Sequence, residues 1–170
     1  MRIQTSSITG WNIAIKTRPV KAKPLINLLV DRSVSSKFLV DTLEGHEPLG
    51  DGSVICLGEA GDAWQQMPKK LLQKYDVTQI DTEGWMICTP KPDNAVNCFE
   101  VTSPSSNIGV YSTKEDNDFT IIGNWGATVG DEKNVQAGTV GDFICQNRTD
   151  PTDVWVVRRK LFLNTYIIKS

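Results

Sequence analysis

The strongest constraint on the fold is an internal repeat, in which two segments share the same order and spacing of residues. Residues 62–77 align with residues 153–168 without a gap, and upstream of them residues 52–56 align with residues 141–145. The matched positions are Asp62 and Asp153, Trp64 and Trp155, Lys69 and Lys160, Tyr75 and Tyr166, and Val77 and Ile168. Agreement across so many kinds of residue predicts two diverged copies of one small folding unit.

Each copy shows the pattern of three short strands followed by one short helix. Short β-branched and aromatic runs that end at glycine or polar residues predict strands. These strands span Phe38–Thr42, Ser53–Leu57 and Ala63–Met67 in the first copy, and Phe119–Ile122, Phe143–Gln146 and Val154–Val157 in the second. The apolar spacing then changes and predicts helices over Lys69–Tyr75 and Lys160–Tyr166. In the first of them Leu71, Leu72 and Tyr75 would share one face.

These patterns predict an α+β, mainly-β protein built from two similar small units. Each unit would be an antiparallel sheet with one short C-terminal helix, and a pseudo-twofold axis would relate the two. We expect the first unit to span residues 1–80 and the second residues 81–170, with the boundary near 78–98, where Gly84–Cys88 predicts one more strand. Units of this size are marginally stable alone, which favours packing of the two copies on each other.

Charge and hydropathy limit the classes of partner. The chain has 18 lysines and arginines against 20 acidic residues, a formal net charge of −2. Proteins that bind duplex nucleic acid usually carry a basic balance, so double-stranded nucleic acid is disfavoured as a partner. No apolar run is long enough to span a bilayer, and the first residues lack the pattern of a signal peptide. We therefore expect a cytoplasmic protein that makes no membrane contact.

The cysteines argue against a metal centre. Cys56, Cys88, Cys98 and Cys145 form no C-x-x-C pair, and His46 is the only histidine. A structural zinc site usually takes its ligands as closely spaced pairs, so we expect no metal and no cofactor. Two disulfides would require an oxidising compartment, which nothing in the sequence indicates. The sequence therefore predicts four reduced thiols that are mostly buried.

The repeated motif resembles the PGDYG family of small phage and bacterial proteins. The residues that carry the resemblance are Gly141-Asp142-Phe143-Ile144, Asp153-Val154-Trp155, Phe162 and Tyr166 in the second copy, and Gly52, Ile55, Gly61-Asp62-Ala63-Trp64, Leu71 and Tyr75 in the first. Neither copy has the family's proline before Gly-Asp, and the tandem arrangement differs from its usual single copy. The resemblance implies a phage or bacterial origin and a compact β-rich fold, and it transfers no catalytic residue.

Seven residues are candidate ligand contacts: Trp64, Trp155, Lys69, Lys70, Arg158, Arg159 and Lys160. The tryptophans could stack on a base or another planar ligand. The alternative, which we favour, is that they anchor each strand to its helix in the core. The cations near the start of each helix could bind a phosphate or an acidic partner surface, or they could be ordinary solvated charges.

Two aspartates are the strongest acid–base candidates. Asp62 and Asp153 could form a pair of carboxylates, since acid–base catalysis often uses two carboxyl groups with different pKa values. Aspartate at such a position is more often a turn-forming residue that hydrogen-bonds to the backbone. The sequence also lacks a G-x-S-x-G motif, a phosphate-binding glycine loop and a nucleophile with an evident partner. These observations favour a protein without enzymatic activity.

Two hypotheses of function follow. The first is a non-enzymatic binding protein, such as a phage accessory or anti-defence factor that engages a host protein in the bacterial cytoplasm. The second is a protein that binds or sequesters a small anionic, nucleotide-like ligand in a cleft between the two copies. A hydrolase that uses Asp62 and Asp153 ranks last.

Overall fold

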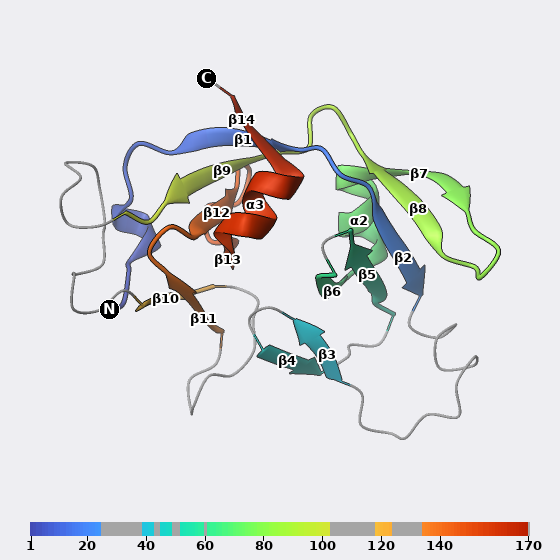
Figure 1. Cartoon of the computed structure of the whole chain (residues 1–170), viewed down its shortest axis with the longest axis horizontal. Helices are drawn as coiled ribbons and strands as arrows, with labels where there is room; N and C mark the ends of the chain where they lie inside the picture. The colour runs from blue at the N-terminus through green and yellow to red at the C-terminus, as the bar shows by residue number, and fades with distance from the viewer. Residues whose placement is uncertain are drawn as a thin grey trace. The chain divides into compact units, whose positions relative to one another are not determined.

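The computed structural model describes residues 1–24, 39–42, 45–48, 52–59, 61–102, 118–123 and 134–169. The chain forms two compact units, which we call the middle unit (Thr17–Asn94) and the terminal unit (Met1–Lys16 with Ala95–Ser170). In their described parts both consist mainly of antiparallel strands, with one short α-helix in each (Figure 1). The prediction of a mainly-β protein with two small α+β units is confirmed.

The middle unit contains a five-stranded antiparallel sheet, in the order β6-β5-β2-β8-β7. Its strands are β2 (Val20–Pro24), β5 (Val54–Gly58), β6 (Ala63–Gln66), β7 (Tyr75–Ile80) and β8 (Met86–Pro90). The helix α2 (Pro68–Lys74) connects β6 to β7, and a separate hairpin pairs β3 (Leu39–Thr42) with β4 (Gly45–Pro48). Phe38, at the start of one predicted strand, lies outside the described residues.

The terminal unit contains a second five-stranded antiparallel sheet, in the order β13-β12-β9-β1-β14. Its strands are β1 (Asn12–Lys16), β9 (Ala95–Glu100), β12 (Phe143–Asn147), β13 (Val154–Val157) and β14 (Tyr166–Lys169). The helix α3 (Arg159–Thr165) connects β13 to β14. The described part of the unit also contains a hairpin of β10 (Asp118–Ile122) and β11 (Val135–Thr139) and the short 3-10 helix η1 (Thr5–Ser7).

The two sheets have the same topology, but the strands that complete them come from different places in the chain. The repeated segments correspond: β5, β6, α2 and β7 match β12, β13, α3 and β14. In each sheet one more strand pairs with the edge strand that follows the helix. This strand is β8, beside β7, in the middle unit and β1, beside β14, in the terminal unit. The middle unit is therefore continuous, while the terminal unit needs a strand from the other end of the chain.

This grouping differs from the predicted division at residues 1–80 and 81–170. The N-terminal strand β1 pairs with β9 and β14 of the second half, and β8 pairs with β2 and β7 of the first half. The physical reason is that partner choice in a sheet depends on non-local contacts. The sequence analysis predicted β8 as one more strand and did not predict β1, β2, β7, β9 or β14.

Both helices pass directly into a strand. Tyr75 and Tyr166 end α2 and α3 in an extended conformation and are the first residues of β7 and β14. Leu71 and Tyr75 are buried, whereas Leu72 is 52% exposed, so the prediction that Leu72 shares their buried face is wrong. Adjacent residues of a helix point about 100° apart, and only one of the two leucines can face the sheet.

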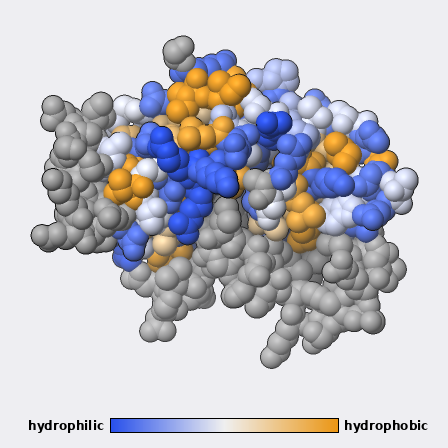
Figure 2. All heavy atoms as spheres, viewed as in Figure 1, coloured by the Kyte–Doolittle hydropathy of each residue, from blue (hydrophilic) through white to orange (hydrophobic). Residues whose placement is uncertain are grey.

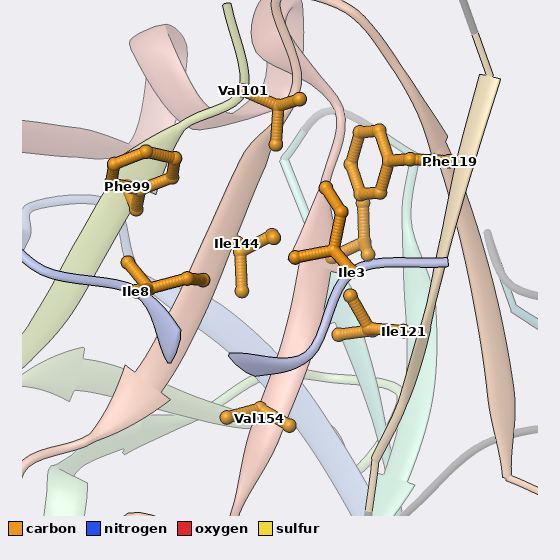
Figure 3. Packing of buried hydrophobic residues seen from close by; sticks show 9 residues of the cluster. Ile3, Ile8, Phe99, Val101, Phe119, Ile121, Ile144 and Val154 are labelled. Atoms are coloured by element: carbon orange, nitrogen blue, oxygen red, sulfur yellow. The ribbon is translucent and has the colours of Figure 1, made fainter. Parts of the chain in front are cut away.

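Among the described residues, three apolar clusters form the cores. One lies beneath α2 and one beneath α3, where Phe143 stacks on Phe162 with ring centroids 3.8 Å apart. The third lies on the other face of the terminal sheet, where the labelled side chains Ile3, Phe119 and Ile144 point toward one another (Figure 3). The hairpin β10–β11 and the N-terminal segment therefore cover the face of this sheet opposite α3. No helix within the described ranges is long and apolar enough to cross a membrane.

Candidate functional site

The two tryptophans occupy equivalent positions at the edges of the helix-covered cores. Trp64 on β6 lies opposite Cys56, and Trp155 on β13 lies opposite Cys145. Each ring is half-buried and packs against the cluster beneath the helix of its own unit. Much of each ring is therefore engaged in packing, which is the structural role that the sequence analysis favoured.

The aspartates hold the turn between two strands in each unit. The backbone N–H of Asn147 donates to the carbonyl oxygen of Asp153, and Gly58 makes the equivalent 2.8 Å bond to Asp62. Asn147 Nδ2 also donates to Asp153 Oδ2 at 3.1 Å. These contacts are those of turn-forming residues, which is the alternative that the sequence favoured for them.

The middle unit lacks this side-chain contact because glycine replaces asparagine. A Cβ atom at Gly58 would lie 2.0 Å from Asp62 Oδ1, so the carboxylate occupies the space that a side chain would need. Asp62 Oδ1 is buried and has no hydrogen-bond partner within the described part of the chain. The two turns have thus diverged in chemistry while keeping the same backbone bond.

A buried polar cluster surrounds Tyr75 in the middle unit. The side chain of Tyr75 is 3% exposed, and burial raises the pKa of its hydroxyl far above the ordinary value, with the nearby Cys56 acting in the same direction. The polar side chain of Asn94 acts in the opposite direction and lowers this pKa. Burial also raises the pKa of the Cys88 thiol. Tyr75 is therefore a neutral phenol at physiological pH, suited to packing rather than to proton transfer.

The predicted basic residues lie at the start of the two helices. Lys69 is exposed and Lys70 is half-buried in the first turn of α2. Arg158, Arg159 and Lys160 are exposed at the start of α3. The structure therefore places the predicted cations near the first turn of each helix.

Two carboxylates partly neutralise the cations of α3. Arg158 lies 3.7 Å from Asp142 Oδ2, and the guanidinium of Arg159 contacts the carboxylate of Glu100. Asp142 is buried, and its Oδ1 accepts a 2.8 Å hydrogen bond from the backbone N–H of Arg159. The carboxylate of Asp142 thus satisfies a backbone donor at the N-terminus of α3. Sequence analysis noted the Gly141-Asp142 motif but did not predict this role.

The sequence analysis did not predict β14, an exposed apolar strand at the edge of the terminal sheet. On β14, Ile167 is 62% exposed and Ile168 is 40% exposed. Ile167 lies opposite Ile15 of β1, so the two share one face of the sheet. The surface over β14 is hydrophobic, beside the C-terminal end of the chain (Figure 2). The available signal was the run Tyr166-Ile167-Ile168, which continues past the predicted end of the helix.

The same position in the middle unit is polar. There Asp76 of β7 lies opposite Thr89 of β8, in the place of Ile167 and Ile15. Lys91 lies 3.9 Å from Asp76. The apolar pair is thus a feature of one unit and is not required by the shared topology.

Comparisons of the chain with protein-family models, with curated proteins and with solved structures found no match. The resemblance to the PGDYG family stays a prediction from the motifs.

Proposed function

We propose that this chain is a non-enzymatic binding protein and that it engages a protein partner along the outer edge of β14. The observation that carries the proposal is the contrast between the paired isoleucines Ile15 and Ile167 and the polar pair Thr89 and Asp76 at the equivalent place. An apolar pair that the fold does not need, on a surface strand, is characteristic of an interaction site.

The position of β14 supports pairing with an extended segment. This strand is the last in the sheet order, and among the described strands it pairs only with β1. An edge strand presents backbone N–H and C=O groups to a further strand, and natural proteins usually protect long apolar edges with charge. On β14 the only charged side chain is Lys169, at its end. Backbone pairing would supply affinity, and the isoleucines would select alternate apolar side chains of the partner.

Charge favours a partner segment that carries acidic residues. Lys16 and Lys169 lie at opposite ends of the β1–β14 pairing, on either side of the pair Ile15 and Ile167. Lys16 lies with its Nζ atom 5.7 Å from the centroid of the Tyr166 ring, which keeps its charge near the strand. An extended segment with apolar residues between acidic ones would match this surface.

We also propose that the two units arose by duplication of one repeat in a phage or bacterial protein. The support is the matched topology of the two sheets together with the matched residues, such as Trp64 and Trp155. In a phage setting the partner would be a host protein. The rival hypothesis, a nucleotide-like ligand, has weaker support, because carboxylates accompany Arg158 and Arg159 and both tryptophans pack against cores.

The test compares the wild-type chain with a variant in which Ile15 and Ile167 are replaced by the residue types found at Thr89 and Asp76 in the middle unit. The double variant Ile15→Thr/Ile167→Asp should keep its fold and lose the partner that the wild-type chain retains from bacterial lysate. The matched control is Ile80→Asp on β7, which changes another exposed isoleucine and should retain that partner. Binding that survives the double variant, or a lysate that yields no partner at any salt concentration, would contradict the proposal.

A second measurement addresses the rival hypothesis directly. Protein purified under native conditions is denatured and its supernatant examined by mass spectrometry. We expect no stoichiometric small anion. Release of a nucleotide-like molecule, with loss of that molecule in Arg158→Ala/Lys160→Ala, would favour the sequestering function instead.

A further inference from the structure

We propose that Cys98 and Cys145 form a redox-active pair, able to close a disulfide between the central strands β9 and β12 of the terminal sheet. The two residues are direct cross-strand partners in the antiparallel register. Both are fully buried, and neither forms a disulfide in this structure. This inference is independent of the proposed binding function, since it concerns the sheet interior beneath α3.

The hydrogen-bond pattern identifies the type of cross-strand position. The register of β9 and β12 runs to the pair Glu100 and Phe143. One position beyond it, the backbone N–H of Val101 donates to the carbonyl oxygen of Asp142 at 3.0 Å. Hydrogen-bonded and non-hydrogen-bonded pairs alternate along an antiparallel ladder. Cys98 and Cys145 lie three positions further along, an odd number, so they form a non-hydrogen-bonded pair.

A non-hydrogen-bonded pair has the spacing that a disulfide needs. Directly opposite Cα atoms at such positions lie about 4.5 Å apart, and their side chains approach each other more closely than at hydrogen-bonded positions. Disulfides span Cα separations of about 4.4 to 6.8 Å. Both side chains belong to the one cluster beneath α3, together with Phe143 and Phe162. The thiols therefore lie on the same face of the sheet, and they can be joined without a shift of strand register.

The middle unit provides an internal comparison. Its residue opposite Cys56 on β2 is Ala22, which occupies the place of Cys98, and Cys88 lies opposite Val20 and Val77. Neither of these thiols has a cysteine as its cross-strand partner. Cys98 and Cys145 are thus placed to form a disulfide with each other, whereas Cys56 and Cys88 are not cross-strand partners of any cysteine.

The chemistry is a two-electron oxidation, for which we take hydrogen peroxide as the oxidant. One thiolate attacks the peroxide, forms a sulfenic acid and releases one water after proton uptake. The second thiol then attacks the sulfenic sulfur, the S–S bond forms and the hydroxyl leaves as a second water. Two thiols are oxidised and one peroxide is reduced to two waters. A dithiol reductant reverses the bond by thiol–disulfide exchange.

Burial sets the conditions for the reaction. It raises the pKa of the Cys98 thiol to about 11, so little thiolate is present near neutral pH. The reaction should therefore be slow at pH 7 and accelerate as the pH rises toward that value.

The experiment uses the full chain in its native state, treated with hydrogen peroxide at several pH values and then quenched by alkylation. We expect an intact mass lower by about 2 Da for the two lost hydrogens, and a non-reduced peptide that links residues 98 and 145. The link should form at least tenfold faster than any link through Cys56 or Cys88, and dithiothreitol should remove it.

Two variants test whether the link depends on Cys98. Cys98→Ala places at this position the residue that the middle unit has at Ala22, so it should fold and lose the linked peptide. Cys88→Ala should fold and retain it. Links distributed equally among the four cysteines, or no 98–145 link in folded chain whose thiols oxidise readily after denaturation, would overturn the proposal.

Discussion

Asp142 accepts a 2.8 Å hydrogen bond through its Oδ1 atom from the backbone N–H of Arg159, the first residue of α3. The middle unit begins its helix in another way. There Ser53 stands in the place of Asp142 and Pro68 in the place of Arg159. Proline has no N–H group to satisfy, so the carboxylate is dispensable at that helix. At the start of α3 a carboxylate accepts the bond of the first backbone N–H, whereas at the start of α2 proline removes that N–H.

This relationship predicts an energetic coupling between positions 142 and 159. Asp142→Ser should lower the free energy of unfolding by about 2 kcal/mol, because Oδ2 also accepts bonds from the backbone N–H and hydroxyl of Thr139. In an Arg159→Pro background, Asp142→Ser should lower the free energy of unfolding by less, since proline lacks the backbone N–H that donates to Asp142. Chemical denaturation of the four proteins of this cycle measures the difference. Equal costs in both backgrounds would show that the helix-start bond contributes nothing.

The turn at Gly58 should not accept a side chain. Gly58→Ala places a Cβ atom 2.0 Å from Asp62 Oδ1, so the short carboxylate side chain must rotate away. We expect a loss of about 1 to 3 kcal/mol in the free energy of unfolding. Removing the obstructing group in Gly58→Ala/Asp62→Ala should recover part of it. Thermal denaturation tests this, and an unchanged melting temperature in the single variant would refute the close contact.

The two units should differ in their ability to fold alone. A fragment of residues 17–94 contains all five strands of its sheet, so it should fold by itself. A fragment of residues 95–170 lacks β1, which lies between β9 and β14 and buries Ala14 completely. That fragment should fold only when a peptide of residues 1–16 is added.

Circular dichroism would follow this complementation. A peptide with Ala14→Asp is the matched control, because a buried unpaired charge at this position should prevent binding. Independent folding of the 95–170 fragment would mean that β1 is an accessory strand rather than an integral one.

Stability should fall at alkaline pH. The folded state raises the pKa of Cys98 from 9.0 to about 11 and raises that of Tyr75 as well. The unfolded chain therefore loses these protons at lower pH than the folded chain, and the stabilisation is present below about pH 9 and lost as the pH rises. The loss can reach about 1.4 kcal/mol per pH unit for each group. Denaturant titrations of wild type and Cys98→Ala should diverge between pH 9 and 11, and parallel curves would contradict the shift.

Local sequence patterns predicted those elements whose formation depends on neighbours in the chain. The segments around Trp64 and Trp155 were predicted as strand followed by helix, and α2 and α3 lie within one residue of the predicted starts. β7 and β14 were missed because no glycine or proline separates Tyr75 and Tyr166 from the preceding helix. The change to extended backbone is imposed by pairing with β8 and β1.

The candidate site was predicted only in part. The basic residues at both helix starts were located correctly, because Lys69 and Arg158 lie beside recognisable helix signals. Their neutralisation by Asp142 and Glu100 depends on contacts with another turn and another strand, which spacing cannot reveal. The exposure of Ile167 was equally hidden, because the place of β14 at the sheet edge depends on its pairing with the distant strand β1.

By itself the sequence determined that this chain forms two β-rich units with matching strand–helix segments, since hydrophobic period and turn residues act over short distances. Tertiary structure alone decided which strand completes each sheet, which carboxylate meets which cation, and that Cys98 faces Cys145. Those outcomes depend on pairing between segments far apart in the chain. Many registers are compatible with the same local pattern, and only the packing of the whole unit selects one.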